Sequence, residues 1–99
     1  MTYNEIINAI NAHLQKSTKK YWSDYYIGIT DNIPERLHGF HKVPENGHWF
    51  KWCKADSEEI ARDVEKYYLE KGMDGGTGGG DEDTVYVYCY EIGLNTKER

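Results

Sequence analysis

The fold is decided by the segment Tyr25-Tyr26-Ile27-Gly28-Ile29-Thr30, and the rest of the chain is organised around it. Its odd-numbered residues are apolar or aromatic, and its even-numbered residues form the opposite face, which is the period-two pattern of a β-strand. Gly28 leaves that second face without a side chain, so another group can approach the backbone there. The segment therefore predicts a strand with one apolar face and one face that is bare at its centre.

A turn and a short helix are predicted directly after this strand. Asp31 and Asn32 supply turn and N-cap chemistry, and Pro34 stands where a helix tolerates proline, in its first turn. We expect this helix to run from about Pro34 to His41 and to carry Arg36. Together with a tyrosine of the strand, this arginine and this histidine are the kinds of side chain that phosphodiester chemistry uses.

Two longer helices are predicted from their caps and their periodicity. The pattern Thr2-Tyr3-Asn4-Glu5 predicts a capping box at the start of a first helix, which ends near Lys16. Asp56, with an acid three residues later, is the expected N-cap of a helix that spans about 57–71 and stops at Gly72. Both segments carry apolar residues at helical spacing, so each helix buries one face.

Two further strands complete the expected fold, one at 49–53 and one at 84–92. The second strand alternates tyrosines on one face with valine and cysteine on the other. The order helix, strand, helix, strand, helix, glycine-rich loop and strand predicts a single α+β domain over residues 1–99. We expect a small three-stranded antiparallel sheet flanked by three helices, followed by a loose tail at 93–99.

The charge balance restricts the class of ligand. With 17 acidic against 12 basic residues the net charge is −5, which repels polyanions at long range. A nucleic-acid ligand would therefore need a local basic patch, and solvated surface lysines are the alternative interpretation of each candidate. The candidates are Lys16, Lys19 and Lys20 before the first strand, and Lys51 and Lys54 beside Trp52.

The cysteines and the hydropathy bear on the cellular compartment. Cys53 and Cys89 both fall in predicted strands, and two widely spaced cysteines do not describe a disulfide scaffold. We expect buried free thiols in a reducing compartment. No apolar run approaches the length of a membrane span, so we expect a cytoplasmic protein without a membrane partner.

The segment 72–83 is unusual because it holds six glycines and four acids. A phosphate-binding glycine loop follows a strand and precedes a helix, and the order here is the reverse. Binding of a hard cation is chemically open, although the four acids lack the spacing of an EF-hand. These acids are Asp74, Asp81, Glu82 and Asp83. A flexible or tightly turned loop is the favoured interpretation.

Several of these motifs together resemble the GIY-YIG nuclease superfamily over roughly residues 25–70. The resemblance rests on Tyr26-Ile27-Gly28, on Arg36-Leu37, on His41, on the aromatic strand, and on Ala61 followed four residues later by Glu65. It implies a GIY-YIG-like fold and a catalytic set of Tyr26, Arg36, His41 and Glu65. It also implies that these side chains converge in one pocket beside Gly28.

The activity that the resemblance implies is phosphodiester hydrolysis that depends on a divalent metal, with a nucleic acid or a nucleotide as substrate. Glu65 would hold Mg²⁺ or Mn²⁺, and a site with one protein carboxylate suits Mg²⁺ because that ion keeps several waters. Arg36 would compensate charge at the phosphate, and Tyr26 with His41 would transfer protons.

Three features of the chain depart from that family pattern, and the last of them is the acidic net charge given above. The first signature strand, expected before Tyr26, is missing from residues 13–23. Arg36 and His41 are five positions apart where four are common, which on an α-helix turns His41 away by roughly a further 100°. The strand at 84–92 would repair the first departure if it lay beside Tyr26 in the sheet and turned one of its tyrosines towards it.

A second class of function stays open beside the enzyme. The same scaffold without catalysis would be a binding module for a nucleotide or a protein partner, as small phage-type accessory or counter-defence proteins are. In that case the effects of mutation would be concentrated on exposed aromatic residues or on the glycine-rich loop.

Overall fold

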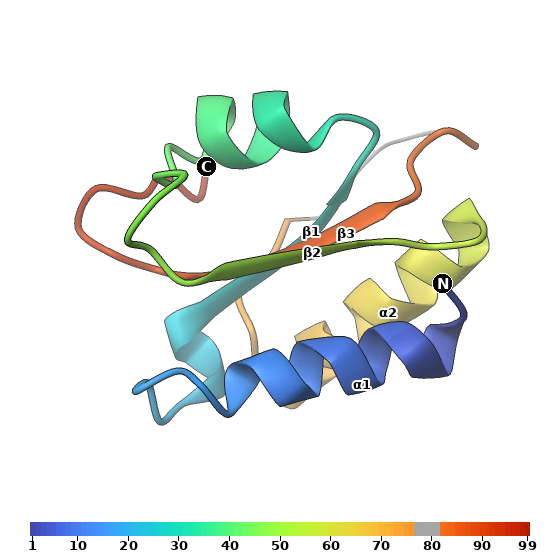
Figure 1. Ribbon diagram of the computed structural model, residues 1–99, viewed down its shortest axis with the longest axis horizontal. Coiled ribbons are helices and arrows are strands. Elements are labelled where there is room, and N and C mark those ends of the chain that lie inside the picture. Colours follow the sequence, from blue (N-terminus) through green and yellow to red (C-terminus); the bar gives the residue numbers. More distant parts are fainter. Residues whose placement is uncertain (77–81) are drawn as a thin grey trace.

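A computed structural model describes residues 1–76 and 82–99 of the chain. Its elements, in chain order, are α1 (Tyr3–Leu14), η1 (Trp22–Asp24), β1 (Tyr25–Thr30), the π-helix η2 (Pro34–Phe40), β2 (Phe50–Lys54), α2 (Glu58–Lys71) and β3 (Tyr86–Glu91). The three strands form an antiparallel sheet in the order β1-β3-β2, so the last strand lies in the middle. Figure 1 shows α1 and α2 on one side of this sheet and η2 on the other. The predicted α+β fold is confirmed.

The larger core lies between the sheet and the helices α1 and α2. Its fully buried members come from four elements: Ile6 and Ile10 of α1, Ile27 of β1, Ala61, Val64 and Tyr68 of α2, and Val87 and Cys89 of β3. Burying a branched aliphatic side chain contributes about 1.5–3 kcal/mol relative to leaving it exposed. The odd-numbered face of β1 therefore fixes which side of the sheet the two long helices cover.

The helix caps confirm one prediction and correct another. The Thr2 hydroxyl accepts from the Glu5 N–H at 3.2 Å, and the Glu5 carboxylate accepts from the Thr2 N–H at 2.8 Å, so the capping box is present. The N-cap of α2 is Ser57, whose hydroxyl accepts from the Ile60 N–H at 3.2 Å. Asp56 was the wrong prediction, because it stands one residue too early and its carboxylate binds the amino terminus instead.

The end of α2 follows the prediction. Gly72 adopts a φ of 116°, the left-handed conformation that glycine reaches without a steric penalty, and it terminates the helix. The chain then turns back, and Asp74 pairs with the outer edge of β1. The Ile27 N–H donates to the Asp74 carbonyl, and the Asp74 N–H donates to the Tyr25 carbonyl, both at 2.9 Å. The exposed edge of the sheet is thereby partly closed.

The position of β3 settles where the tyrosine-rich strand lies. It pairs directly with β1, with Tyr90 opposite Tyr26 and Tyr88 opposite Gly28. The prediction that this strand lies beside Tyr26 and turns tyrosines towards it is therefore confirmed. β3 holds the central position of the sheet because it pairs with β2 along its other edge.

The tail at 93–99 is not loose, and that prediction was wrong. The Lys97 N–H donates to the His41 carbonyl at 2.7 Å, and the Arg99 guanidinium binds the Asp74 carboxylate at 2.9 Å. Figure 1 shows the C-terminal end of the chain lying against η2. A polar segment of seven residues gave no periodic signal, yet specific hydrogen bonds hold it in place.

Both cysteines are buried free thiols, as predicted from their place in the strands. Cys89 is fully enclosed, and its sulfur lies 3.8 Å from that of Met73. Within residues 1–76 and 82–99, no helix combines the length and the apolar character needed to cross a bilayer.

Candidate functional site

A cluster of aromatic and polar side chains lies between the sheet and η2. The sheet contributes Tyr26, Tyr88 and Tyr90, and the end of η2 contributes His41, and we call these four residues the tyrosine–histidine cluster. The ring centres of Tyr26 and His41 are 4.6 Å apart, and those of Tyr26 and Tyr90 are 5.3 Å apart. Their exposed fractions range from 0% for His41 and Tyr90 to 3% for Tyr26. The cluster is therefore a second, polar core on the side of the sheet away from the long helices.

Gly28 makes room for this cluster. A Cβ atom at position 28 would lie 2.4 Å from both the Cζ and the hydroxyl oxygen of Tyr88, a distance that no side chain tolerates. The group that approaches the bare face of β1 is therefore the phenol of Tyr88. The place beside the glycine, which the sequence suggested for a pocket, is filled by this ring.

The hydrogen bonds of His41 define its tautomer. Its Nδ1 lies 2.6 Å from the Lys97 carbonyl oxygen, which can only accept, so Nδ1 carries the proton. Its Nε2 is therefore unprotonated and accepts a hydrogen bond from the Tyr88 hydroxyl at 2.8 Å. Burial lowers the pKa of His41, which keeps the imidazole neutral. The arrangement is a neutral base in direct contact with a phenolic proton.

The π-helical geometry of η2 brings Arg36 and His41 together. The His41 N–H donates to the Arg36 carbonyl at 3.0 Å, an i to i−5 bond. The rotation expected from an α-helix does not arise, because a π-turn accommodates one more residue in each turn. Burial is the main cause of the lowered pKa of His41, and the charge of Arg36 adds to it. Short π-helical segments frequently occur at functional sites.

Arg36 also acts on the phenols of the cluster. Its guanidinium stacks on the Phe40 ring, 4.4 Å from the ring centre, and hydrogen-bonds to Tyr88. Burial raises the pKa of Tyr88 well above its ordinary value, and Arg36 opposes that rise. At neutral pH Tyr88 therefore keeps its proton. If Tyr88 were to lose it, Arg36 is the neighbouring cation that would stabilise the Tyr88 phenolate.

Tyr26 is oriented differently from Tyr88. Its ring contacts His41, while its hydroxyl meets the backbone N–H of Gly76. A Cβ at Gly76 would lie 3.2 Å from that hydroxyl oxygen, so the described part of the glycine-rich segment fits closely over Tyr26. Burial raises the pKa of Tyr26, and the charges of Arg36 and Arg99 oppose the rise.

Glu65 lies on α2 and is coupled to the cluster through its charge. It is buried, with an exposed fraction of 9%, and burial raises its pKa while Arg62 opposes the rise. Its charge also contributes to the raised pKa of Tyr88. Among the described residues, no hydrogen bond joins it to Tyr26, Arg36 or His41. The structure thus brings these three together, whereas Glu65 stands on α2, on the other side of the sheet (Figure 1), and its charge acts on Tyr88.

The described side chains include few potential metal ligands near the tyrosine–histidine cluster. In the part of the chain that the structure describes, no group of three or more histidine, cysteine, aspartate or glutamate side chains has the arrangement to hold a metal ion. Glu65 is a single carboxylate, and Mg²⁺ is commonly bound through one or two carboxylates together with waters and substrate phosphates. Of the acids in the glycine-rich segment, Asp74 is paired with Arg99, and Asp81 lies outside the described residues.

Sequence reasoning did not assign Tyr88 and Tyr90 to the site. The signals for them were the alternation of tyrosines along residues 86–90, which put them on one face, and the expectation that this strand could turn a tyrosine towards Tyr26; neither signal showed that they would contact His41. Comparison with family models, with curated proteins and with solved structures found no match to this chain.

Proposed function

We propose that this protein hydrolyses phosphodiester bonds of a nucleic acid or a nucleotide with a divalent metal, as a divergent member of the GIY-YIG type. The observation that carries the proposal is the hydrogen bond from the Tyr88 hydroxyl to His41 Nε2, 2.8 Å long, beside the Arg36 guanidinium. Tyr88 stands on the strand next to Tyr26, where the missing signature strand would be needed. It takes the proton-transfer role that the resemblance gave to Tyr26.

The chemistry follows from the positions of the protons. His41 Nε2 takes the Tyr88 proton, and the phenolate oxygen takes a proton from the water that attacks phosphorus. A new oxygen–phosphorus bond forms while the bond from phosphorus to the leaving oxygen breaks, and the proton held by the His41 imidazolium passes through solvent to the leaving oxygen, which restores neutral His41. Arg36 compensates the charge on the phenolate and on the phosphoryl oxygens. General acid–base catalysis of this kind contributes about 10²–10⁴-fold to a rate.

Glu65 is the residue that would hold the metal. When bound there, Mg²⁺ or Mn²⁺ would neutralise charge on the phosphoryl group. Burial raises the pKa of the Glu65 carboxyl group, so keeping it ionised inside the protein costs stability. Carboxyl groups with shifted pKa values are common at active sites, which supports a functional role for Glu65.

The experiment measures cleavage of bis(p-nitrophenyl) phosphate and of end-labelled single-stranded and double-stranded oligonucleotides, with Mg²⁺ or Mn²⁺ and with EDTA. Tyr88→Phe and Glu65→Gln should each lower kcat by about 10²-fold or more. Tyr86→Phe is the matched control, since Tyr86 is on the same strand and face and is only partly buried. Cleavage that is unchanged by Glu65→Gln, or no metal-dependent cleavage of any of these substrates, would overturn the proposal.

A binding module is the second candidate, and the burial of the cluster favours it. His41 and Tyr88 have exposed fractions of 0% and 1%, so their hydroxyl and imidazole groups do not face solvent. The exposed aromatic Trp52 lies against Tyr86, and the Lys54 ammonium stands 5.8 Å from the Tyr86 ring centre, an arrangement suited to stacking a base beside a phosphate. Nucleotide binding that Trp52→Ala abolishes, without any cleavage, would favour this function over hydrolysis.

A further inference from the structure

The four residues Thr96–Arg99 lie across the tyrosine–histidine cluster and make contacts on both sides of β1. His41 is held by two hydrogen bonds to a single residue of this segment. The Lys97 N–H donates to the His41 carbonyl at 2.7 Å, and His41 Nδ1 donates to the Lys97 carbonyl at 2.6 Å. Both bonds involve the backbone of Lys97, so they do not depend on its side chain.

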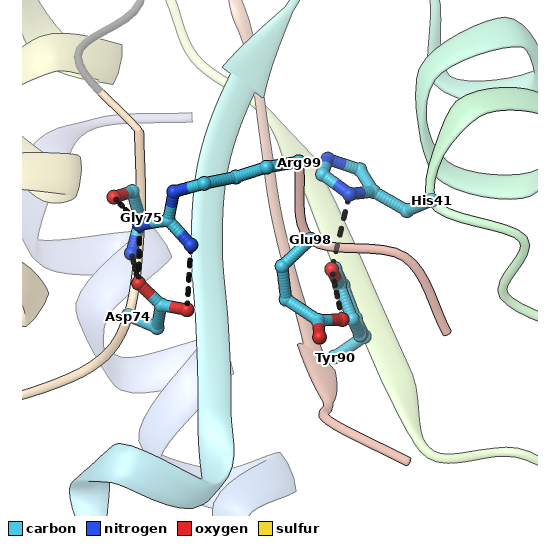
Figure 2. Close-up of polar contacts among 6 residues, drawn as sticks. All are labelled: His41, Asp74, Gly75, Tyr90, Glu98 and Arg99. Carbon is cyan, nitrogen blue, oxygen red and sulfur yellow. Dashed lines mark hydrogen bonds and ion pairs between the residues drawn. The ribbon is translucent and has the colours of Figure 1, made fainter. Parts of the chain in front are cut away.

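The next two residues extend the contact in opposite directions. The Tyr90 hydroxyl donates to the Glu98 carboxylate at 3.0 Å. Arg99 donates to both oxygens of Asp74, at 2.9 and 3.2 Å, and to the Gly75 carbonyl at 3.2 Å. Figure 2 shows the Arg99 side chain crossing in front of β1, with Asp74 and Gly75 on one side and His41 and Tyr90 on the other.

These contacts cover groups that a substrate of the proposed site would need. The Nδ1 proton of His41 and the hydroxyl of Tyr90 are both engaged, and the charge of Arg99 acts on Tyr26. Glu98 places a carboxylate against Tyr90, which is where an anionic substrate group would otherwise meet the cluster. The segment therefore occupies the approach to His41 from the side opposite Tyr88.

The segment is held by contacts that are individually weak. The Arg99 side chain is 65% exposed, and an ion pair in such a position is worth little in water. The net contribution of one such hydrogen bond shifts the equilibrium between the closed and the open segment by only about two- to tenfold. Because the segment has no buried apolar side chain and only a few contacts of this size, it covers the site reversibly.

We propose that Thr96–Arg99 is a displaceable strap, which covers the tyrosine–histidine cluster in the resting protein. The strap opens when the Arg99–Asp74 ion pair and the two hydrogen bonds between Lys97 and His41 break. This inference rests on the proposed function, because it names the regulation of the same site. Opening exposes the His41 ring and Tyr90 to solvent. The hydrogen bond from the Tyr88 hydroxyl to His41 Nε2 is kept on average, but without the strap each transient break of that bond lets a reagent reach the Nε2 lone pair.

The test measures how fast diethyl pyrocarbonate modifies His41 in the full chain, by mass spectrometry of the His41 peptide. Lys97→Pro removes the N–H that binds the His41 carbonyl, and the expected result is a modification rate about two- to tenfold higher. Lys97→Ala is the control for the side chain, because it keeps both backbone bonds and removes the contact of the Lys97 ammonium with the Phe40 ring, 5.3 Å from the ring centre; it should change the rate far less than Lys97→Pro. His38, which is partly exposed and outside the strap, is the internal reference.

A charge-reversal pair tests the second attachment without proline. Arg99→Glu should raise the rate about two- to fivefold, and adding Asp74→Arg should restore it by recreating the ion pair in reverse. Far-UV circular dichroism checks that each variant is folded. A His41 rate that neither Lys97→Pro nor Arg99→Glu changes in folded protein would overturn the strap.

The two proposals fail in distinguishable ways. If hydrolysis occurs, the opened variants should cleave faster than the unaltered chain in parallel with their His41 rates. Faster modification without any cleavage would refute the hydrolytic function and leave the strap standing. Cleavage that is unaffected by opening, with His41 unreactive in every variant, would refute the strap and leave hydrolysis standing.

Discussion

Replacing Gly28 with alanine tests how the cluster is built, and the sign of the effect is informative. Alanine normally stabilises an interior position of regular structure relative to glycine, by roughly 0.5–1 kcal/mol. At position 28 the new Cβ would lie 2.4 Å from the Tyr88 hydroxyl oxygen and 2.9 Å from its Cε1. The ring has no free direction of movement, because Tyr88 is 1% exposed and its hydroxyl is bound to His41.

Overpacking of this kind costs about 1–3 kcal/mol. Gly28→Ala should therefore lower the free energy of unfolding by that amount, which corresponds to a fall in melting temperature of about 4–8 °C for each kcal/mol in a domain of this size. The measurement is urea unfolding followed by circular dichroism. Gly39→Ala is the control, since a Cβ there meets only the Pro34 carbonyl oxygen, at 3.7 Å, and it should be neutral or stabilising.

A double-mutant cycle assigns the cost to the right pair of residues. In a Tyr88→Ala background the clash is absent, so Gly28→Ala should lose its penalty, with a coupling energy of about 1 kcal/mol or more between the two sites. A neutral or stabilising Gly28→Ala, or the same penalty in both backgrounds, would refute the reasoning that Gly28 exists to admit the Tyr88 ring.

Three further predictions concern protonation and capping. The pKa of His41 is lowered in the folded protein, so the unfolded chain binds a proton at higher pH, and the free energy of unfolding should fall as the pH drops below about 6.5. In His41→Gln the free energy of unfolding should fall less steeply with decreasing pH than in the unaltered chain. Burial raises the pKa of Glu65, so its contribution to stability falls as the pH rises from the ordinary glutamate pKa through the raised one, and Glu65→Gln should raise the melting temperature at pH 7; a lower melting temperature would contradict a net cost of burying the ionised carboxylate. Ser57→Ala should cost about 1 kcal/mol of unfolding free energy, because Ser57 caps α2; Asp56→Ala should cost only roughly 0.2–0.5 kcal/mol, as expected for an exposed ion pair, and the reverse order would restore Asp56 as the cap.

Periodicity and capping chemistry were sufficient to predict the main helices and strands and the α+β class of the fold. The alternation along β1 and β3, the capping box of α1 and the glycine stop of α2 are local signals, and each led to the observed element. The N-cap of α2 was misplaced by one residue, because Asp56 and Ser57 are both good capping residues and only the path of the chain decides between them.

The site was predicted less completely, for two physical reasons. The spacing of Arg36 and His41 indicates their separation only if the helix type is known, and η2 is π-helical instead of α-helical. Contacts between distant segments, such as Tyr88 with His41 or Lys97 with His41, depend on strand order and on the path of the tail. No local pattern encodes a strand order in which β3 separates β1 from β2.

The protonation state of His41 tests the central claim most directly, because both the proposed chemistry and the strap depend on it. Two-dimensional ¹H–¹⁵N spectra of the imidazole ring at neutral pH distinguish the two neutral tautomers from the cation. We expect a neutral ring with the proton on Nδ1, bound to the Lys97 carbonyl, and an unprotonated Nε2 whose shift responds to Tyr88→Phe. A proton on Nε2, or a charged ring at pH 7, would contradict the Tyr88-to-His41 proton transfer on which the function is built.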